Sequence, residues 1–234
     1  MISVVIIGSG NVATHLAATF LKVDTIAMTQ INSRNLNSIP PADVTIIAVS
    51  DNAISEVSSK ITNSFVVHTS GSVTMDALKN TGSKGVFYPL QSFSKDKEVD
   101  FMRIPFCLEA ENKDDLSKLE TLVSVLNGKI YHINSEQRKS IHVAAVFVNN
   151  FTNHMYTIAD DICKQYDVPF EILAPLIEET SLKIKNLSPK EAQTGPAKRN
   201  DTETIQNHLN LLSKAQQDIY LKITQSILDY GKKL

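Results

Sequence analysis

Short runs of apolar and β-branched residues recur along the first half of the chain and predict strands. Runs of this length, bounded by turn residues, are typical of strands in a buried sheet. The first run ends at a glycine. The seven runs cover residues 2–7, 25–31, 44–49, 65–68, 85–88, 106–109 and 129–133.

Stretches with helical spacing of apolar residues lie between several of these runs and predict helices. They cover residues 12–22, 53–61, 74–80 and 113–126. Asp51 or Asn52 is expected to cap the second helix and Asn112 the last, and Gly128 is a plausible stop. Strands that alternate with helices predict a mostly parallel sheet with helices on its faces.

After residue 134 the strand pattern ends and only helical patterns follow. Residues 136–166 predict one long helix, which Pro169 ends. Residues 170–186 predict a second helix, in which Pro175 marks a kink or a new start.

The rest of the chain predicts a loop and two more helices. Residues 189–199 carry two prolines and a glycine, which favours a loop. Asp201 or Thr202 is expected to cap the helix that follows, and residues 213–230 predict the final helix. We therefore expect an α/β domain over residues 1–133 and an all-helical domain over residues 134–234.

Composition and charge narrow the class of protein. Hydrophobic residues make up 42% and charged residues 21%, a normal globular mixture. The 23 basic and 25 acidic side chains give a net charge of -2, so no basic excess favours nucleic acid. The apolar run at residues 141–148 is far shorter than the ~20 residues of a membrane span. With no signal peptide evident, a cytoplasmic protein that binds neither membrane nor nucleic acid is expected.

No metal or disulfide site is expected. The two cysteines, Cys107 and Cys163, are too few for a framework and lie in apolar or helical sequence. The histidines at positions 15, 132, 154 and 208 show no metal-ligand spacing with one another or with a cysteine.

The loop after the first strand has the spacing of a dinucleotide-binding fingerprint. Gly8 permits a tight turn, Gly10 lets a pyrophosphate approach the backbone, and Ala13 allows close packing of helix on strand. The helix N-terminus offers free N–H groups to phosphates. The alternative is a glycine turn that binds nothing. The predicted phosphate loop consists of Gly8, Ser9, Gly10, Asn11 and Val12.

The end of the second strand bears on the choice between NADP and NAD. A site for NAD usually places Asp or Glu there, but this chain has Asn32, Ser33 and Arg34. An arginine with small polar neighbours suits a 2′-phosphate, so NADP is favoured over NAD. Alternatively, Arg34 is an ordinary solvated residue. Only residues 35–43 precede the next strand, too few for a helix and a further strand.

Several motifs together resemble a known family. They are GSGNVA at residues 8–13, NSRN at 32–35, and the segments at 42–51, 68–72, 88–93 and 194–201. The chain resembles Rossmann-like NADP oxidoreductases with a C-terminal helical domain of unknown function. These belong with pyrroline-5-carboxylate reductase, β-hydroxyacid dehydrogenases and 6-phosphogluconate dehydrogenase-like proteins. The resemblance implies a Rossmann-like domain and a homodimer built through the helices.

Polar residues that follow other strands are candidates for the rest of the cleft. They would hold the nicotinamide, or a substrate carboxylate or carbonyl, where strand ends meet. The alternative is a turn with local Ser and Thr hydrogen bonds. The related family tends to have histidine where this chain has Tyr88. Predicted cofactor contacts are Val49, Ser50, Thr69 and Ser70, and predicted substrate contacts are His68, Ser70, Gly71, Gln91, Ser92 and Arg199.

His142 is the main candidate for acid–base chemistry. It lies in an apolar stretch of the long helix, and Asn149 lies seven positions on, on the same predicted face. His142 could donate a proton to a carbonyl or imine, and Asn149 could orient the substrate oxygen. Alternatively, His142 is a satisfied interface histidine. The lysine–asparagine pair of β-hydroxyacid dehydrogenases is absent, because Lys139 is followed four residues later by Val143.

The sequence leaves two alternatives for Arg199 and two for the function of the protein. With Lys198, Arg199 could bind a substrate anion, or the two could form a solvated basic loop beside Asp201. The first hypothesis is an NADP-dependent oxidoreductase acting on a small carbonyl or imine compound. The alternative is a non-catalytic NADP(H)-binding sensor or regulatory dimer. A purely structural dimer would leave the phosphate loop unexplained.

Overall fold

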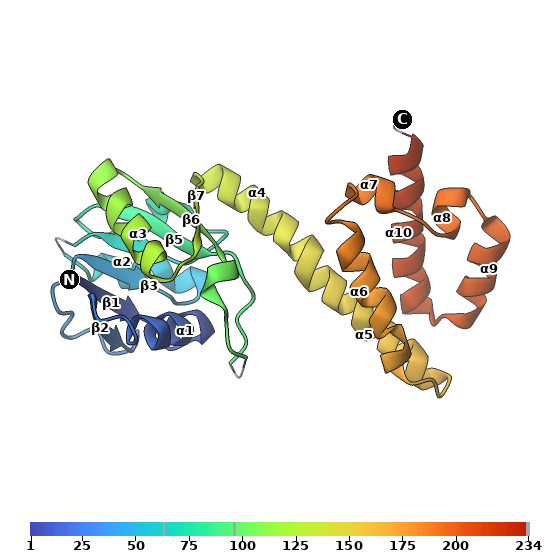
Figure 1. Cartoon of the computed structure of the whole chain (residues 1–234), viewed down its shortest axis with the longest axis horizontal. Coiled ribbons are helices and arrows are strands. Elements are labelled where there is room, and N and C mark those ends of the chain that lie inside the picture. The colour runs from blue at the N-terminus through green and yellow to red at the C-terminus, as the bar shows by residue number, and fades with distance from the viewer. Residues whose placement is uncertain (63, 96, 233–234) are drawn as a thin grey trace. The chain divides into compact units, whose positions relative to one another are not determined.

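The computed structural model describes residues 1–62, 64–95 and 97–232. The chain forms two compact units, Met1–Val146 and Phe147–Leu234, whose elements are drawn in Figure 1. The division falls later than the expected boundary at residue 134, because helix α4 (Ser135–Ala145) is anchored to the sheet of the first unit through Arg138 and Glu109.

The first unit is built on a mostly parallel sheet. The strand order is β2-β1-β3-β4-β5-β6-β7, and only the pairing of β5 with β6 is antiparallel. Every predicted strand is confirmed to within about two residues. The strands are β1 (Ile2–Ile7), β2 (Ile26–Ile31), β3 (Val44–Ile47), β4 (Val66–His68), β5 (Lys84–Pro89), β6 (Pro105–Ala110) and β7 (Lys129–His132).

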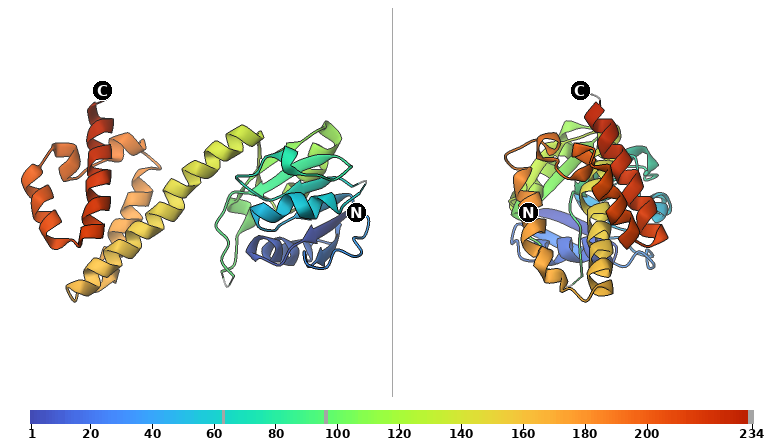
Figure 2. Two further views of the ribbon diagram at one scale, coloured as in Figure 1. Left: turned by 180° about the vertical axis from the view of Figure 1, so that it is seen from behind. Right: turned by 90° about the vertical axis from the view of Figure 1, so that its right-hand side faces the viewer.

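Helices cover both faces of this sheet, as Figures 1 and 2 show. Helices α1 (Asn11–Phe20) and α3 (Lys113–Val125) pack on one core, and α2 (Ile54–Ser59) packs on the other. Strand β1 is buried on both faces toward its end, which explains its continuous apolar run. The α/β, Rossmann-like sheet with a separate helical unit is therefore confirmed.

Strand β2 is an edge strand of this sheet. It pairs with β1, and in the described residues no further strand pairs with its other side. The expected loss of a third strand after residue 34 is thereby confirmed. The segment that would carry this strand runs directly to β3, so the sheet ends beside the second strand of the nucleotide-binding half.

Two local expectations in the first unit, a helix over residues 74–80 and a cap for α2, are wrong. Residues 74–80 form only a 3₁₀ turn, Met75–Ala77, because the buried Leu78 turns extended (ψ 134°) and Asn80 donates to backbone carbonyls of the next turn. Neither Asp51 nor Asn52 caps α2, which continues from the 3₁₀ turn Asp51–Ala53.

Of the two residues expected to bound helix α3, Asn112 was predicted correctly and Gly128 was not. Asn112 caps its start, because its Oδ1 accepts from the Asp115 N–H at 2.9 Å. The left-handed residue at its end is Asn127 (φ 53°), not Gly128. Gly128 is required for packing, since a Cβ there would lie 2.8 Å from the Phe106 ring.

The second unit is all helical. The predicted helix over residues 136–166 is interrupted by a π-helical turn, Val146–Phe151, between α4 and α5 (Thr152–Gln165). Pro175 marks a new start, in the first turn of α6 (Ala174–Lys183), which follows a 3₁₀ turn at Phe170–Leu173.

The predicted loop at residues 189–199 contains two short helices. They are α7 (Pro189–Ala192) and α8 (Pro196–Arg199). A capping box between Ser188 and Glu191 starts the first, and Gly195 (φ 104°) permits the turn into the second. Asp201 caps α9 (Thr202–Leu211), and α10 (Lys214–Lys232) is the last helix.

The described residues show two further absences. No helix among them has both the length and the apolar character that crossing a bilayer requires. No three histidine, cysteine or acidic side chains among residues 1–62, 64–95 and 97–232 are grouped in a way that could hold a metal ion.

Candidate functional site

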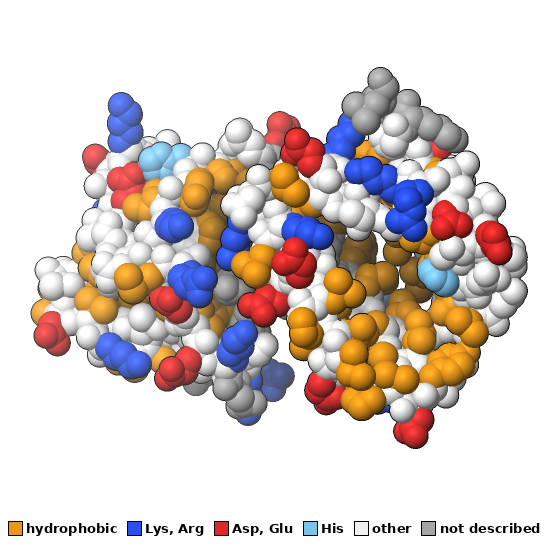
Figure 3. All heavy atoms as spheres, turned by 45° about the vertical axis from the view of Figure 1, so that its right-hand side comes forward, with side chains coloured by type: hydrophobic (Ala, Val, Ile, Leu, Met, Phe, Trp, Pro, Cys, Tyr) orange, Lys and Arg blue, Asp and Glu red, His pale blue; other side chains and the backbone are white. Residues whose placement is uncertain are grey.

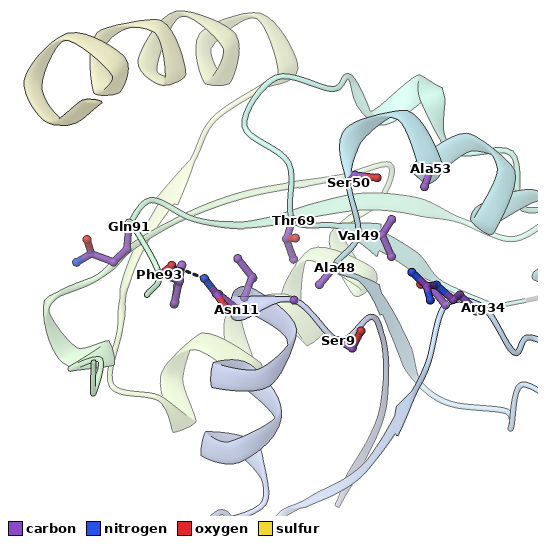
Figure 4. Close-up of a pocket in the computed structure, with 13 residues that line it drawn as sticks. Ser9, Asn11, Arg34, Ala48, Val49, Ser50, Ala53, Thr69, Gln91 and Phe93 are labelled. Carbon is purple, nitrogen blue, oxygen red and sulfur yellow. Dashed lines mark hydrogen bonds between the residues drawn. The ribbon is translucent and has the colours of Figure 1, made fainter. Parts of the chain in front are cut away.

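A cleft of about 600 Å³ opens where β1, β3 and β4 end, at their carboxyl edge (Figure 4). Ligands of open parallel sheets bind at this edge, because loops and helix N-termini meet there. Among the described residues, no acidic side chain lines the cleft. The lining residues are Ser9, Gly10, Asn11, Val12, Ser33, Arg34, Ala48, Val49, Ser50, Ala53, Thr69, Gln91 and Phe93.

The N-terminus of α1 forms one wall of the cleft and suits an anion. Its cap residue, Gly10, supplies no side-chain hydrogen bond, and the first turn contains no acidic residue. The first N–H groups of a helix have no partner within the helix, and the helix dipole favours negative charge there. A Cβ at Gly10 would meet nothing within 4 Å, so a phosphate can approach the backbone. The residues present therefore fit the pyrophosphate of a dinucleotide.

Gly8 forms the tight turn that leads from β1 into this wall. Its φ of 144° is accessible to glycine, and a Cβ there would lie 2.1 Å from the Ala48 carbonyl oxygen. The Gln30 side chain donates to the Gly8 carbonyl at 2.9 Å, which holds the turn against β2. Gly8 is thus required by the close approach of β1 and β3.

Arg34 lies toward one end of the cleft and Gln91 toward the other (Figure 4). Asn32 does not line the cleft. Its Oδ1 accepts from the Arg34 N–H at 3.0 Å and so shapes the turn that carries Ser33 and Arg34. The guanidinium forms no ion pair with an acidic side chain in the described residues, which leaves its donors available to a ligand.

Asn11 connects the phosphate loop to the opposite wall. Its side-chain amide donates to the Phe93 carbonyl at 2.8 Å (Figure 4), and His15 contacts the Ser94 carbonyl at 2.9 Å. The segment after β5 is thereby held over α1, and Gln91 and Phe93 line the cleft. Ser92 does not line it, and its N–H is hydrogen bonded to the Gln91 side chain.

His68 and Ser70 support the loop after β4 rather than open into the cleft. His68 is fully buried; its Nδ1 accepts from the Ser70 N–H at 3.2 Å, and its Nε2 contacts the Thr74 carbonyl at 3.3 Å. Burial lowers the pKa of His68 to about 4, so the ring is neutral at pH 7. The Ser70 Oγ accepts from two N–H groups of the same loop. In this arrangement neither side chain reaches a ligand in the cleft, unlike Thr69.

His142 forms a pair with Tyr88 beside Gly71. The Tyr88 hydroxyl lies 3.1 Å from His142 Nδ1, and burial raises the pKa of Tyr88 to about 12. A Cβ at Gly71 would lie 2.5 Å from His142 Nδ1 and 2.8 Å from Tyr88 Cζ. The predicted candidates His142 and Gly71 therefore come together in the first unit, although neither of them lines the cleft.

A buried ion pair holds the helix that carries His142. Arg138 is fully buried, and it pairs with Glu109 on β6. It also donates to the Val73 carbonyl at 2.6 Å, while Ser135 Oγ donates to Glu109 at 2.8 Å. These bonds join α4 to the sheet and to the loop of Gly71. Sequence reasoning missed this network, because nothing in the spacing of these residues indicates that they meet.

Two further candidates lie in the second unit, and their roles remain predictions. Asn149 is an exposed residue of the π-helical turn. Arg199 is exposed at the end of α8, with its guanidinium 3.8 Å from the Asp201 carboxylate. This partly exposed contact agrees with the alternative of a solvated basic loop. It also leaves N–H groups of the guanidinium able to donate to a ligand.

The fold and the cleft define a dinucleotide-binding class of protein, and comparison with known proteins gives the family. The model of the family described as Domain of unknown function (DUF2520) matches residues 104–227. The chain belongs to this family. Among curated protein sequences, none matches it.

Solved structures show the same architecture over the whole chain. A proposed NADP oxidoreductase from Bacteroides fragilis has 38% sequence identity and a TM-score of 0.86, covering 97% of this chain and 98% of that one. A protein from Thermotoga maritima has 19% identity and a TM-score of 0.74, covering 98% of both chains. A 1-pyrroline-5-carboxylate reductase from Streptococcus pyogenes has 12% identity and a TM-score of 0.60, covering 100% and 99%, and shares the fold alone.

Proposed function

We propose that this protein is an NADP-dependent oxidoreductase that acts on a small carbonyl or imine compound. The observation that carries the proposal is the N-terminus of α1, which has no side-chain cap and faces a cleft that Arg34 lines and that no acidic side chain of the described residues lines. The similarity to the Bacteroides fragilis protein, described as an NADP oxidoreductase, supports it.

The proposed roles follow from the chemistry of each wall. The α1 N-terminus binds the pyrophosphate, and Arg34 with Ser33 binds the 2′-phosphate through charge-assisted hydrogen bonds. A bound nicotinamide would supply hydride chemistry at the end near Thr69 and Gln91. His142 donates a hydrogen bond to the reacting oxygen or nitrogen, and Arg199 and Asn149 remain candidates for holding the substrate.

Replacing Arg34 with glutamine is expected to weaken NADPH binding by about 10- to 100-fold. Hydrogen bonds to charged groups contribute roughly 1.5–3 kcal/mol, which corresponds to that range. NADH lacks the 2′-phosphate, so its affinity is expected to change little. Titration of the purified protein, followed by nicotinamide fluorescence, measures both dissociation constants.

The matched control is Arg103→Gln, an exposed arginine of the same unit that does not line the cleft. It is expected to bind both nucleotides like the wild-type protein. Tighter binding of NADH than of NADPH by the wild-type protein would contradict the role of Arg34. Binding of neither nucleotide would contradict the proposed function itself.

A non-catalytic NADP(H) sensor is the second candidate function. It is favoured by the absence of an asparagine four residues after Lys139, where Val143 stands, because this removes the residue pair that dehydrogenases of the superfamily use. A panel of keto acids, aldehydes and imino acids with NADPH distinguishes the two. Nucleotide binding without oxidation of NADPH by any compound favours the sensor.

We also propose that the second unit pairs with a second copy of this chain. Ala197 is its one buried residue in the described part, although a unit of this size normally buries a core. Large apolar side chains gather on its visible surface (Figure 3), and α5, α8 and α10 line an apolar groove of about 250 Å³. A helix of a second copy would supply the missing cover.

Replacing Ile223 in this groove with glutamate is expected to convert the dimer into monomer. Ile223 is 44% exposed, and burial of its new charge at an interface would be unfavourable. Gln225→Glu is the control, since it adds the same charge two residues on, toward the other side of α10. Sedimentation velocity at several concentrations measures the state. A wild-type protein that stays monomeric at micromolar concentration contradicts the proposal.

A further inference from the structure

The side chains of Tyr88 and His142 form a contact that the sequence did not predict. Tyr88 is on β5 and His142 on α4, and the hydroxyl oxygen lies 3.1 Å from Nδ1. The rings meet edge to face at 69°, with centroids 6.2 Å apart. Because Arg138 and Ser135 anchor α4 to Glu109 on β6, the two elements that carry the pair are held together.

The number of acceptors near the Tyr88 hydroxyl indicates which of the two side chains donates this hydrogen bond. Within the described residues, the Tyr88 hydroxyl has no hydrogen-bond partner other than His142. If His142 donated from Nδ1, the buried phenolic proton would lack a protein acceptor, which is costly. The phenol also remains protonated, because burial raises its pKa to about 12. The consistent arrangement has Tyr88 donating to Nδ1, with the imidazole proton on Nε2.

The free edge of the imidazole is then a donor. The described structure gives His142 Nε2 no hydrogen-bond partner, and the side chain is half-buried. The hydrogen bond at one ring nitrogen of a neutral histidine decides which nitrogen carries the proton. His142 would therefore present an N–H group, not a lone pair, to whatever occupies the space beside it.

We propose that Tyr88 is a positioning residue that holds His142 as its Nε2–H tautomer, so that the site receives a carbonyl oxygen. This inference rests on the proposed function and chooses between its two substrate classes. A carbonyl oxygen accepts a hydrogen bond from Nε2–H. A protonated imine carries its own N–H and a positive charge, so the two donors would oppose each other.

Gly71 leaves the room that the pair needs. Its φ lies outside the left-handed region, so the requirement is spatial rather than conformational. An alanine Cβ would contact both the imidazole and the phenol ring at less than 3 Å. Gly71→Ala therefore disturbs the pair without removing any of its polar atoms, and it provides a second variant beside Tyr88→Phe.

The test is to determine the histidine tautomer by ¹⁵N NMR at about pH 8, above the usual histidine pKa of about 6.5. Full-length wild-type protein, labelled at histidine, is compared with Tyr88→Phe, and the missing signal of His142→Gln assigns the resonance. Wild-type His142 is expected as Nε2–H. In Tyr88→Phe the ratio of Nε2–H to Nδ1–H is expected to fall by about threefold to tenfold, as for the loss of one hydrogen bond.

The chain offers a matched control in another tyrosine–histidine contact. The Tyr220 hydroxyl lies 2.8 Å from His208 Nδ1 in the second unit. Tyr220→Phe is expected to shift the His208 signals and to leave those of His142 unchanged. Wild-type His142 in the Nδ1–H form, or an unchanged tautomer ratio in folded Tyr88→Phe, overturns the positioning role. The wild-type measurement decides even if the variant does not fold.

Turnover assays separate this inference from the proposed function. With NADPH, carbonyl compounds are expected to react and iminium compounds of the same carbon skeleton to react at least about tenfold more slowly. Faster reduction of the iminium compounds overturns the carbonyl assignment. Absence of turnover with every compound contradicts both the proposed function and the carbonyl assignment, while the NMR result stands by itself.

Discussion

Replacing Gly8 with alanine is expected to abolish nucleotide binding and to destabilise the first unit by about 2–6 kcal/mol. The new Cβ would lie 2.1 Å from the Ala48 carbonyl oxygen, which is backbone of the adjoining segment after β3 and cannot rotate away. The φ of 144° adds strain for any residue with a side chain. A strained backbone position and overpacking each cost roughly 1–3 kcal/mol. Thermal unfolding and the nucleotide titration measure the two effects.

Gly10→Ala is the matched control for this prediction. A Cβ at Gly10 meets nothing within 4 Å and its φ is -77°, so the fold tolerates alanine. The same Cβ would enter the space through which a pyrophosphate reaches the α1 backbone. Gly10→Ala is therefore expected to keep the wild-type Tm while NADPH binding weakens by at least tenfold. Wild-type nucleotide affinity in both glycine variants would remove the phosphate loop from the proposed site.

Replacing Arg138 with methionine is expected to cost about 3–5 kcal/mol of stability, because it leaves the Glu109 carboxylate without its cation. Arg138 is fully buried, and Glu109 has a side-chain exposure of 16%. The Val73 carbonyl also loses its donor, so the loop of Gly71 loosens from α4. A decrease in Tm of about 10 °C corresponds to this change in free energy for a chain of this length.

Two comparisons test the cause of this effect. In the double variant Arg138→Met with Glu109→Gln, the buried negative charge is absent, and a part of the stability is expected to return. Lys164→Met removes an exposed ion pair with Asp160 on α5, and Tm is expected to stay nearly unchanged. If Arg138→Met unfolds at the wild-type temperature, the network does not anchor α4.

The strands and the glycine-containing turn between β1 and α1 could be predicted from the sequence because their signals are local. β1 is a run of six residues that ends before Gly8, and Gly8 and Gly10 follow at fixed spacing. The short segment after Arg34 leaves no room for a helix and another strand, which correctly predicted that the usual third strand is missing beside β2. The 3₁₀ turn at Met75–Ala77 could not be predicted in this way, because burial of Leu78 and the bonds of Asn80 override its helical pattern.

The sequence by itself therefore determined the α/β and helical halves and the glycine turn at the start of α1, and it singled out the candidate histidine, since each depends on neighbours a few positions apart. Only the tertiary structure decided what surrounds that histidine. Tyr88 and His142 are 54 positions apart, and Glu109 and Arg138 are 29 positions apart. Their contacts arise from packing α4 against the sheet, and hydrophobic periodicity carries no information about such pairings. Periodicity also could not show that His68, a polar residue beside the predicted cleft, is buried and accepts a hydrogen bond from the loop that follows it.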